Sequence, residues 1–405
     1  ADTELEVEGQ TPHQEMLVTG EYRFHLKGDR LDRLNSLFDM KLPKNTPVNL
    51  KGEFRSSRNA DSGKWEYSLD AKGKETETRL KGSSAQPYAL PGMEAEFDVK
   101  GKDFKSLAAL FGTDLDIKGG YELSGKLAES GKKGKGKQRP WALDLVLAVR
   151  DLTLRLKGHA LHPAQPEDGN YRFELQGNPE QLSAITGIQI PSKDTYQLSG
   201  QLDASVGKDK GRWRLDLSLA IEDLKLKASG STIRPFDTGG LDVEFSVEGE
   251  RVESLLPLIH LTLPLQGKYR GSGKLVEQKD HYEFDQLKLQ VGETGIEGRL
   301  AIYHKQPRSR IVAEFTANEL HMQNLELVSK DPEQGAKSES GKRLIPDYTF
   351  PTALLDKADM NVSLRVDRVM TQLGELGQLN LKTSLQDRLF RIDPLEVTGW
   401  DGGKI

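Results

Sequence analysis

A repeat with a period of about 73 residues is the feature that most constrains how this chain can fold. One glycine per copy lies at Gly28, Gly101, Gly177 and Gly249, and a second lies at Gly52, Gly125, Gly200 and Gly273. Trp65, Trp141 and Trp213 occupy one further place in three copies, and Tyr282 occupies it in the fourth. These landmarks recur at nearly the same interval, which indicates a repeat protein.

Segments within each copy alternate between apolar and polar residues, so each is expected to be a strand with one apolar and one polar face. The cleanest copy runs from Tyr171 to Gly230 and has four such segments, among them Trp213–Ile221. Helical apolar spacing follows the first glycine of each copy, near residues 31–38, 104–111, 182–185 and 252–259. The sequence therefore predicts a mainly β fold: an elongated, twisted antiparallel sheet of repeats that forms an open hydrophobic groove, with short helices between strands.

We expect one repeat array over residues 1–320, with copies near 22–82, 94–158, 171–230 and 241–302 and a fifth that starts at 310. In the fourth copy, Tyr282/Phe284 and Leu287/Leu289/Val291 are expected on separate strands. Residues 321–405 are expected to form a C-terminal segment with a charged, disordered loop at 330–342, strands at 360–366 and 376–385, and a strand pair around 389–397. We expect this segment to be truncated, because a strand pattern begins at residues 402–405.

Composition suits a sheet with one face in water. Hydrophobic residues make up 36% of the 405 residues and charged residues 29%, which is a small apolar share for a globular core of this size. The net charge of -5 gives no bulk attraction to nucleic acid. The absence of cysteine excludes disulfides, thiolate catalysis and cysteine-based metal sites.

Motifs for chemistry are weak. His159 and His162 could share a metal, but no carboxylate lies at useful spacing, and a loop without a ligand role is favoured. Gly271-Ser272-Gly273-Lys274 is too incomplete for a phosphate loop, and we expect its repeat glycines to mark bulges or bends. The basic run Lys132–Arg139 could touch phosphates or lipid head groups, although a solvated hairpin tip is favoured. We therefore expect no enzyme, no catalytic residue, no metal and no cofactor.

The apolar face of the predicted sheet is the feature that needs an explanation. It would be a closed core if parts of the array packed on each other, and an open groove for alkyl chains if they did not. An exposed apolar strip is an aggregation hazard unless something occupies it. The predicted lining of a lipid groove is Trp65, Tyr67, Leu69, Trp141, Leu143, Leu145, Leu147, Leu154, Trp213, Leu215, Leu217, Leu219, Leu226, Val243, Phe245, Tyr282, Phe284 and Leu289.

Two stretches of the chain resemble the AsmA-like family of bacterial envelope proteins. The first contains Leu255-Leu256-Pro257, Leu263-Pro264-Leu265-Gln266-Gly267-Lys268-Tyr269, Tyr282-Glu283-Phe284 and Gly295-Ile296-Glu297-Gly298-Arg299-Leu300. The second contains Ile345-Pro346-Asp347, Ala358-Asp359-Met360-Asn361-Val362, Leu389-Phe390-Arg391-Ile392-Asp393-Pro394-Leu395 and Gly402-Gly403. With the upstream copies, the resemblance covers most of residues 22–405 through degenerate apolar and glycine motifs.

This resemblance implies a repeating β-groove anchored in the inner membrane and projecting through the periplasm of a Gram-negative cell. Family members are thought to act as bridges along which phospholipid moves toward the outer membrane. The resemblance thus implies a phospholipid or another acyl-chain lipid as partner, an N-terminal anchor that this sequence lacks, and a possible outer-membrane partner. It carries over no catalytic residue, and no nucleic-acid partner is expected.

Three functions remain open from the sequence. The leading one is a periplasmic, bridge-like lipid-transfer protein that shields acyl chains in its groove. The alternative is an envelope structural or assembly factor that assists outer-membrane protein biogenesis by strand addition at sheet edges. An enzyme that acts on envelope polymers is the weakest, because no acid–base pair is positioned. Lipids extracted from the purified protein would separate the first two.

Overall fold

The computed structural model describes residues 4–11, 19–29, 48–86, 92–110, 117–129, 140–160, 169–186, 194–204, 211–233, 239–252, 267–303, 308–321, 358–371 and 374–398. Contacts divide the chain into two compact units. The first unit comprises Ala1–Ile188 and Lys193–Lys210, and the second comprises Gln189–Ser192 and Gly211–Ile405. The loop predicted at 330–342 lies outside the described residues.

Alternating apolar and polar residues form the strands of the first unit, as the sequence predicts. Its described strands are β1 (Glu4–Gln10), β2 (Gly20–Gly28), β3 (Val48–Arg58), β4 (Trp65–Gly73), β5 (Thr76–Ser84), β6 (Glu94–Gly101), β7 (Tyr121–Glu129), β8 (Trp141–Val149), β9 (Leu152–Ala160), β10 (Asn170–Gly177) and β11 (Tyr196–Ala204). Two short helices follow strands that end in glycine: α2 (Phe104–Leu110) after β6 and α3 (Pro179–Thr186) after β10. Both helices match predicted helical segments. The segment predicted at 31–38 lies outside the described residues, as does 252–259 beyond its first residue.

The second unit contains the other described strands. These are β12 (Trp213–Ile221), β13 (Leu224–Thr232), β14 (Asp242–Gly249), β15 (Tyr269–Glu277), β16 (His281–Val291), β17 (Thr294–Tyr303), β18 (Ser309–His321), β19 (Ala358–Thr371), β20 (Gly374–Leu376), β21 (Leu379–Gln386) and β22 (Leu389–Val397). The described chain is therefore mainly β, with almost no helix.

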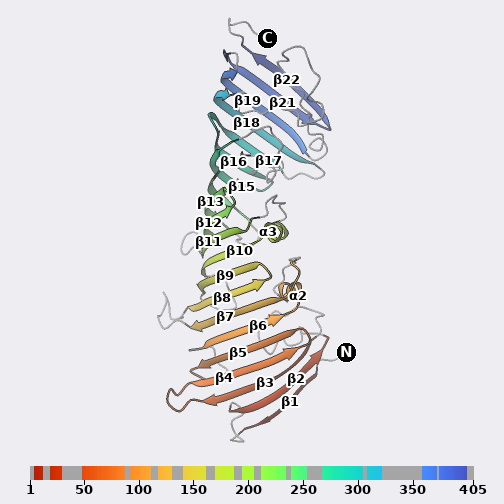
Figure 1. The fold of residues 1–405 in the computed structure, drawn as a ribbon, viewed down its shortest axis with the longest axis vertical. Coiled ribbons are helices and arrows are strands. Elements are labelled where there is room, and N and C mark those ends of the chain that lie inside the picture. The colour runs from red at the N-terminus through yellow and green to blue at the C-terminus, as the bar shows by residue number, and fades with distance from the viewer. Residues whose placement is uncertain are drawn as a thin grey trace. The chain divides into compact units, whose positions relative to one another are not determined.

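Within each unit nearly all strands pair with their neighbours in the sequence, and nearly every pair is antiparallel. In the first unit the antiparallel pairs run without a break from β1–β2 to β10–β11, as Figure 1 shows. In the second unit they run from β12–β13 to β17–β18 and continue with β19–β21 and β21–β22. The sheet is open, since β1 and β22 each pair with a single described strand. Short connections explain this order, because they join neighbouring antiparallel strands.

One pair departs from the antiparallel rule. β18 and β19 run parallel, with Ile311 opposite Met360 and Phe315 opposite Leu364. A parallel pair needs a crossover connection of a dozen residues or more. The chain between His321 and Ala358 supplies that length. The sheet is therefore mixed at this point.

Three expectations about strand division were wrong. Tyr282 and Leu289 lie on one strand, β16, and not on two. The register shifts between Phe284 and Leu287, which marks a bulge within the strand. Before the bulge the apolar side chains stand at even-numbered positions, and after it they stand at odd-numbered positions. The segment around 389–397 is a single strand, β22, and not a pair. The strand predicted at 376–385 is divided between β20, which ends at Leu376, and β21.

Candidate functional site

The predicted lining residues of the first unit share one face of its sheet. Residues directly opposite each other in paired strands point to the same side. The register runs across five strands, from Leu69 through Leu80, Phe97 and Gly125 to Leu145. Steps of two residues along each strand stay on that side. The face therefore includes Trp65, Tyr67 and Leu69 on β4, Trp141, Leu143, Leu145 and Leu147 on β8, and Leu154 on β9.

The predicted lining residues of the second unit also share one face. Here the register runs from Leu215 through Gly230, Val243 and Leu275 to Phe284. The rings of Phe245 and Phe284 meet edge to face at a centroid distance of 6.2 Å. This face includes Trp213, Leu215, Leu217 and Leu219 on β12, Leu226 on β13, Val243 and Phe245 on β14, and Tyr282, Phe284 and Leu289 on β16. We refer to each set as the apolar face of its unit.

Burial along these faces is uneven, and the strand ends are the most covered parts. On β12, Trp213, Leu215 and Ile221 are each 5% exposed, whereas Leu217 and Leu219 between them are only partly buried. β8 repeats this arrangement, with Trp141 and Val149 buried and the residues between them partly exposed. On these strands the apolar face is thus closed near both strand ends and partly open to solvent along its middle, whereas Trp65 at the start of β4 and Tyr282 near the start of β16 are only partly buried.

Aromatic rings cover the repeat glycines on the apolar faces. Phenylalanine lies directly opposite the second repeat glycine of each copy, in the pairs Phe24–Gly52, Phe97–Gly125, Phe173–Gly200 and Phe245–Gly273. A β-carbon on Gly52 would lie 2.8 Å from the Phe24 ring and 2.5 Å from the Asp70 carbonyl oxygen. The glycines were expected to mark bulges or bends, but among their described pairings a register shift occurs only around Gly273. Their main role is to admit a ring from the neighbouring strand.

Buried tyrosines form a second recurring pair with glycine that the sequence analysis missed. Tyr121, Tyr196 and Tyr269 lie opposite the glycines that end the preceding strands, Gly101, Gly177 and Gly249. The three side chains are at most 5% exposed. Burial raises the pKa of Tyr196 to about 12, and burial together with the nearby Asp223 charge raises the pKa of Tyr269 to about 12. The recurrence of tyrosine at the repeat period was the signal available in the sequence.

These tyrosines help to close the strand ends. The Tyr121 ring packs edge to face on Phe104, the first residue of α2, at 6.3 Å and 71°. Tyr196 lies beside Gly177, and Gln181 of α3 donates to the Val149 carbonyl at 3.4 Å. The helices therefore rest over ends of the apolar face and leave its middle uncovered. This explains the uneven burial in the first unit.

The opposite face of the strands is charged and balanced. Cross-strand pairs join acid to base, as in Lys100 Nζ–Glu122 Oε1 at 2.7 Å and Arg299 Nη2–Glu314 Oε2 at 2.9 Å. These side chains are more than half exposed. Exposed pairs of this kind contribute little stability and mark a solvated surface. We refer to this surface as the polar face.

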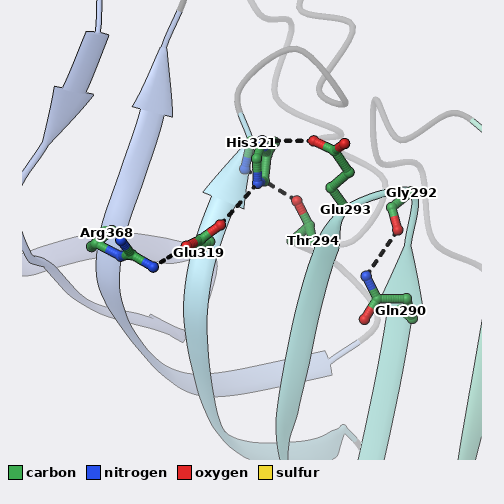
Figure 2. Close-up of polar contacts among 7 residues, drawn as sticks. All are labelled: Gln290, Gly292, Glu293, Thr294, Glu319, His321 and Arg368. Atoms are coloured by element: carbon green, nitrogen blue, oxygen red, sulfur yellow. Dashed lines mark hydrogen bonds and ion pairs between the residues drawn. The ribbon is translucent and has the colours of Figure 1, made fainter.

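A charged cluster lies at the end of β18, and Figure 2 shows its contacts. The two ring nitrogens of His321 approach different carboxylates, Nδ1–Glu293 Oε2 and Nε2–Glu319 Oε2, both at 3.3 Å. Glu319 also contacts Arg368 on β19, and the backbone N–H of His321 donates to Thr294 Oγ1 at 3.1 Å. Because the carboxylates lie at opposite sides of the ring, they cannot share one metal ion with it. The cluster ties β17, β18 and β19 together.

Other motifs from the sequence have no chemistry in the described residues. His159 is exposed on β9, and His162 and Lys132–Arg139 lie outside the described residues. Gly271–Lys274 lies within strand β15, so it is not a phosphate loop. Among the described residues, no group of three His, Cys, Asp or Glu side chains could hold a metal ion. None of the described helices is long and apolar enough to cross a membrane.

Comparison with family models, curated proteins and solved structures gives no match to this chain. The resemblance to AsmA-like proteins therefore depends on the apolar and glycine motifs alone. What the described residues provide is a long, mostly antiparallel sheet with an apolar and a polar face.

Proposed function

We propose that this chain is a periplasmic, bridge-like lipid-transfer protein that shields acyl chains along its apolar faces. The observation that carries the proposal is the in-register apolar face of each unit, buried at the strand ends and partly open along the middle. Soluble proteins rarely leave a continuous apolar strip in water. A strip that runs across successive strands fits a long, flexible, apolar ligand better than a compact one.

The side chains of the open strip favour an acyl chain. They are leucines and phenylalanines, such as Leu145 in the first unit and Leu217 and Phe245 in the second. No charged residue lies in the register from Leu69 to Leu145 or from Leu217 to Phe245. Each methylene group that leaves water contributes about 0.8 kcal/mol. An acyl chain needs no directional partner, so hydrogen-bonding groups are not required along its path. Glycines under aromatic rings keep the surface even where neighbouring strands meet.

We also propose a groove, a repeat and a family for this chain. The apolar face is a groove, the underlying unit is a repeat of about 73 residues, and the chain belongs with the AsmA-like proteins. Recurrent Phe–Gly and Tyr–Gly pairs support the repeat, since they occur at corresponding places in successive copies. By the same resemblance, the full protein is tethered to the inner membrane and has a partner at the outer membrane. Phospholipid is the expected cargo.

A charge placed on the open strip tests this function. Leu217 is partly exposed on the apolar face of β12, and the adjacent Asp216 is exposed on the polar face. We expect Leu217→Glu to remain folded, because mobile acyl chains and water can accommodate the carboxylate, but to lose bound lipid. Asp216→Lys, the matched control, should keep both stability and lipid.

The measurements are thermal unfolding and mass spectrometry of lipids extracted from each purified protein. A closed core would instead bury the new carboxylate without a partner, and Leu217→Glu would lose several kcal/mol, on the order of 3 kcal/mol or more. Wild-type protein without bound lipid, or a stable Leu217→Glu that retains it, would contradict the proposal.

A further inference from the structure

The free edge of β1 is a regular strand with no second neighbour among the described strands. β1 pairs with β2 over all seven of its residues, from Glu4 opposite Lys27 to Gln10 opposite Glu21, without a register shift. All seven residues are exposed. The strand contains no proline, so no backbone N–H is missing from the alternate residues whose hydrogen-bonding groups face away from β2. Such an edge is a template for another strand.

Two aliphatic side chains on β1 lie open on the apolar face. Leu5 is 54% exposed and Val7 is 55% exposed. They stand opposite Leu26 and Phe24 of β2, which are themselves only partly exposed. Leu5 and Val7 pack beside Leu26 and Phe24 of β2, and apolar side chains on an added strand would pack beside Leu5 and Val7 in the same way. The edge therefore offers apolar burial as well as hydrogen bonds.

The polar face of β1 carries one sign of charge. Glu4, Glu6 and Glu8 alternate with Leu5 and Val7 along the strand. They lie opposite basic residues of β2: Glu4 opposite Lys27, Glu6 opposite His25 and Glu8 opposite Arg23. Arg23 in turn contacts Glu53 of β3 at 3.1 Å. The sign of the charge thus alternates from β1 to β2 to β3. Among the described strands, Glu4, Glu6 and Glu8 have basic residues beside them only on β2.

The edge at β22 differs in ways that hinder pairing. Pro394 lies within β22 and lacks a backbone N–H, and the register with β21 shifts between Leu381 and Thr383. Of its exposed aliphatic residues, Ile392 and Leu395 lie opposite Thr383 and Leu381 and so share a face across the bulge, whereas Leu389 lies opposite Gln386 on the other face. Proline and bulges are devices that protect sheet edges. β1 has neither between Glu4 and Gln10.

We propose that the free edge of β1 takes an extended cationic protein segment as an additional strand. The segment alternates lysine or arginine with aliphatic residues. Its basic side chains lie against Glu4, Glu6 and Glu8, and its aliphatic side chains cover Leu5 and Val7. Backbone hydrogen bonds to β1 complete the pairing. This interaction is independent of lipid binding by the apolar faces.

Binding of short peptides to the full chain tests the proposal. The probe is a labelled, end-blocked Lys-Val-Lys-Val-Lys-Val-Lys peptide, compared with its Glu-Val counterpart at low ionic strength by fluorescence anisotropy. A third peptide has the cationic sequence with alternate backbone nitrogens methylated, which keeps the charge and removes the hydrogen bonds. Hydrogen exchange locates the bound peptide. A triple variant, Glu4→Lys, Glu6→Lys and Glu8→Lys, reverses the charge of the edge.

We expect the cationic peptide to bind at least about tenfold more tightly than the anionic one, since three opposite-charge cross-strand pairs replace three like-charge pairs. The triple variant should reverse this preference, the methylated peptide should not bind, and exchange should slow in β1. The proposal fails if the methylated peptide binds equally well, if both charges bind alike, if no peptide binds, or if protection appears away from β1. Self-association through β1 that excludes the peptide would also overturn it.

Discussion

Gly52 shows how a single residue is fixed by the strand beside it. A β-carbon at this position would lie 2.5 Å from the Asp70 carbonyl oxygen, 2.8 Å from the Phe24 ring and 2.9 Å from the Ala71 α-carbon. Two of these three atoms belong to the backbone and cannot move aside cheaply. The period in the sequence identified Gly52 as a landmark, but the reason for the glycine is a cross-strand contact that sequence spacing does not contain.

Replacing Gly52 with alanine should therefore destabilise the fold. We expect Gly52→Ala to cost about 1–3 kcal/mol, as overpacking of a tight contact does. Gly295→Ala is the control, because its β-carbon would approach only the end of the flexible Gln290 side chain, at 2.9 Å. Chemical unfolding of both variants measures the difference. Equal stability of the two variants would show that the Phe24 contact does not determine the residue at position 52.

At the scale of elements, strict alternation was the most informative signal in the sequence. The segment predicted at Trp213–Ile221 is strand β12 with the same bounds, because its period of two has no interruption. Alternation also placed every predicted lining residue on the apolar face of its unit. Alternation gave the wrong result in β16, where the apolar residues shift from even to odd positions. A bulge within one strand and a turn between two strands both produce such a shift in a sequence.

Long-range pairing and close packing were beyond the sequence analysis. The parallel pairing of β18 with β19 depends on the long connection between His321 and Ala358, whose path alternation does not encode. Similarly, each Tyr–Gly pair joins the last residue of one strand to the first residue of the next, and the tyrosine recurrence in the sequence does not show this contact without the register. The charged cluster around His321 combines side chains that are far apart in the sequence, so no local motif marked it.

The β12–β13 turn provides a test at this scale through Asp223. Its Oδ2 accepts hydrogen bonds from the backbone N–H groups of Glu250 at 2.7 Å and Arg251 at 3.0 Å, which ties the turn to the end of β14. Burial opposes ionisation of this carboxyl, but those N–H groups and the Arg251 charge outweigh burial and lower its pKa below the ordinary 3.8. The ionised form is therefore the one that the fold favours.

We expect Asp223→Ala to destabilise the protein by about 1–2 kcal/mol at neutral pH, as loss of a capping side chain does. Because the folded-state pKa is lowered, the charge contributes stability above the ordinary aspartate pKa and loses it as pH falls through the lowered value. The difference between wild type and variant should thus shrink in acid. Asp223→Asn keeps an acceptor oxygen and should lose less. Unfolding measured from neutral to acid pH checks this, and a constant difference across pH would contradict it.

At the scale of the whole molecule, the low apolar content of the chain is compatible with its large number of strands. A sheet of 22 described strands with one wet face needs apolar residues at only every second position. The paired charges of the polar face keep that side solvated, and the apolar face is left to interact with something else. The 36% hydrophobic content of the chain is consistent with this division.

Sequence-order pairing within each unit leads to a prediction for the dimensions of the whole chain. Successive strands add to one side, so we expect the complete protein to be elongated. Since β20 and β21 both lie beside β19, the 22 strands would occupy about 21 positions, and a row of these spaced about 4.8 Å apart would extend about 100 Å. A compact protein of 405 residues would have a radius of gyration of about 22 Å. Small-angle scattering distinguishes the two, and we expect a radius of about 30 Å, as for a rod of that length.

The same measurement bears on function, because shape and exposure of the apolar faces are linked. A radius near the compact value would mean that parts of the sheet pack on each other and bury Leu217 and its neighbours in a closed core. Leu217→Glu should then unfold the protein and not merely release lipid. An extended molecule whose Leu217→Glu variant stays folded would keep the apolar faces free for acyl chains over its length. Measured together on one preparation, scattering and the stability of this variant decide between the two arrangements.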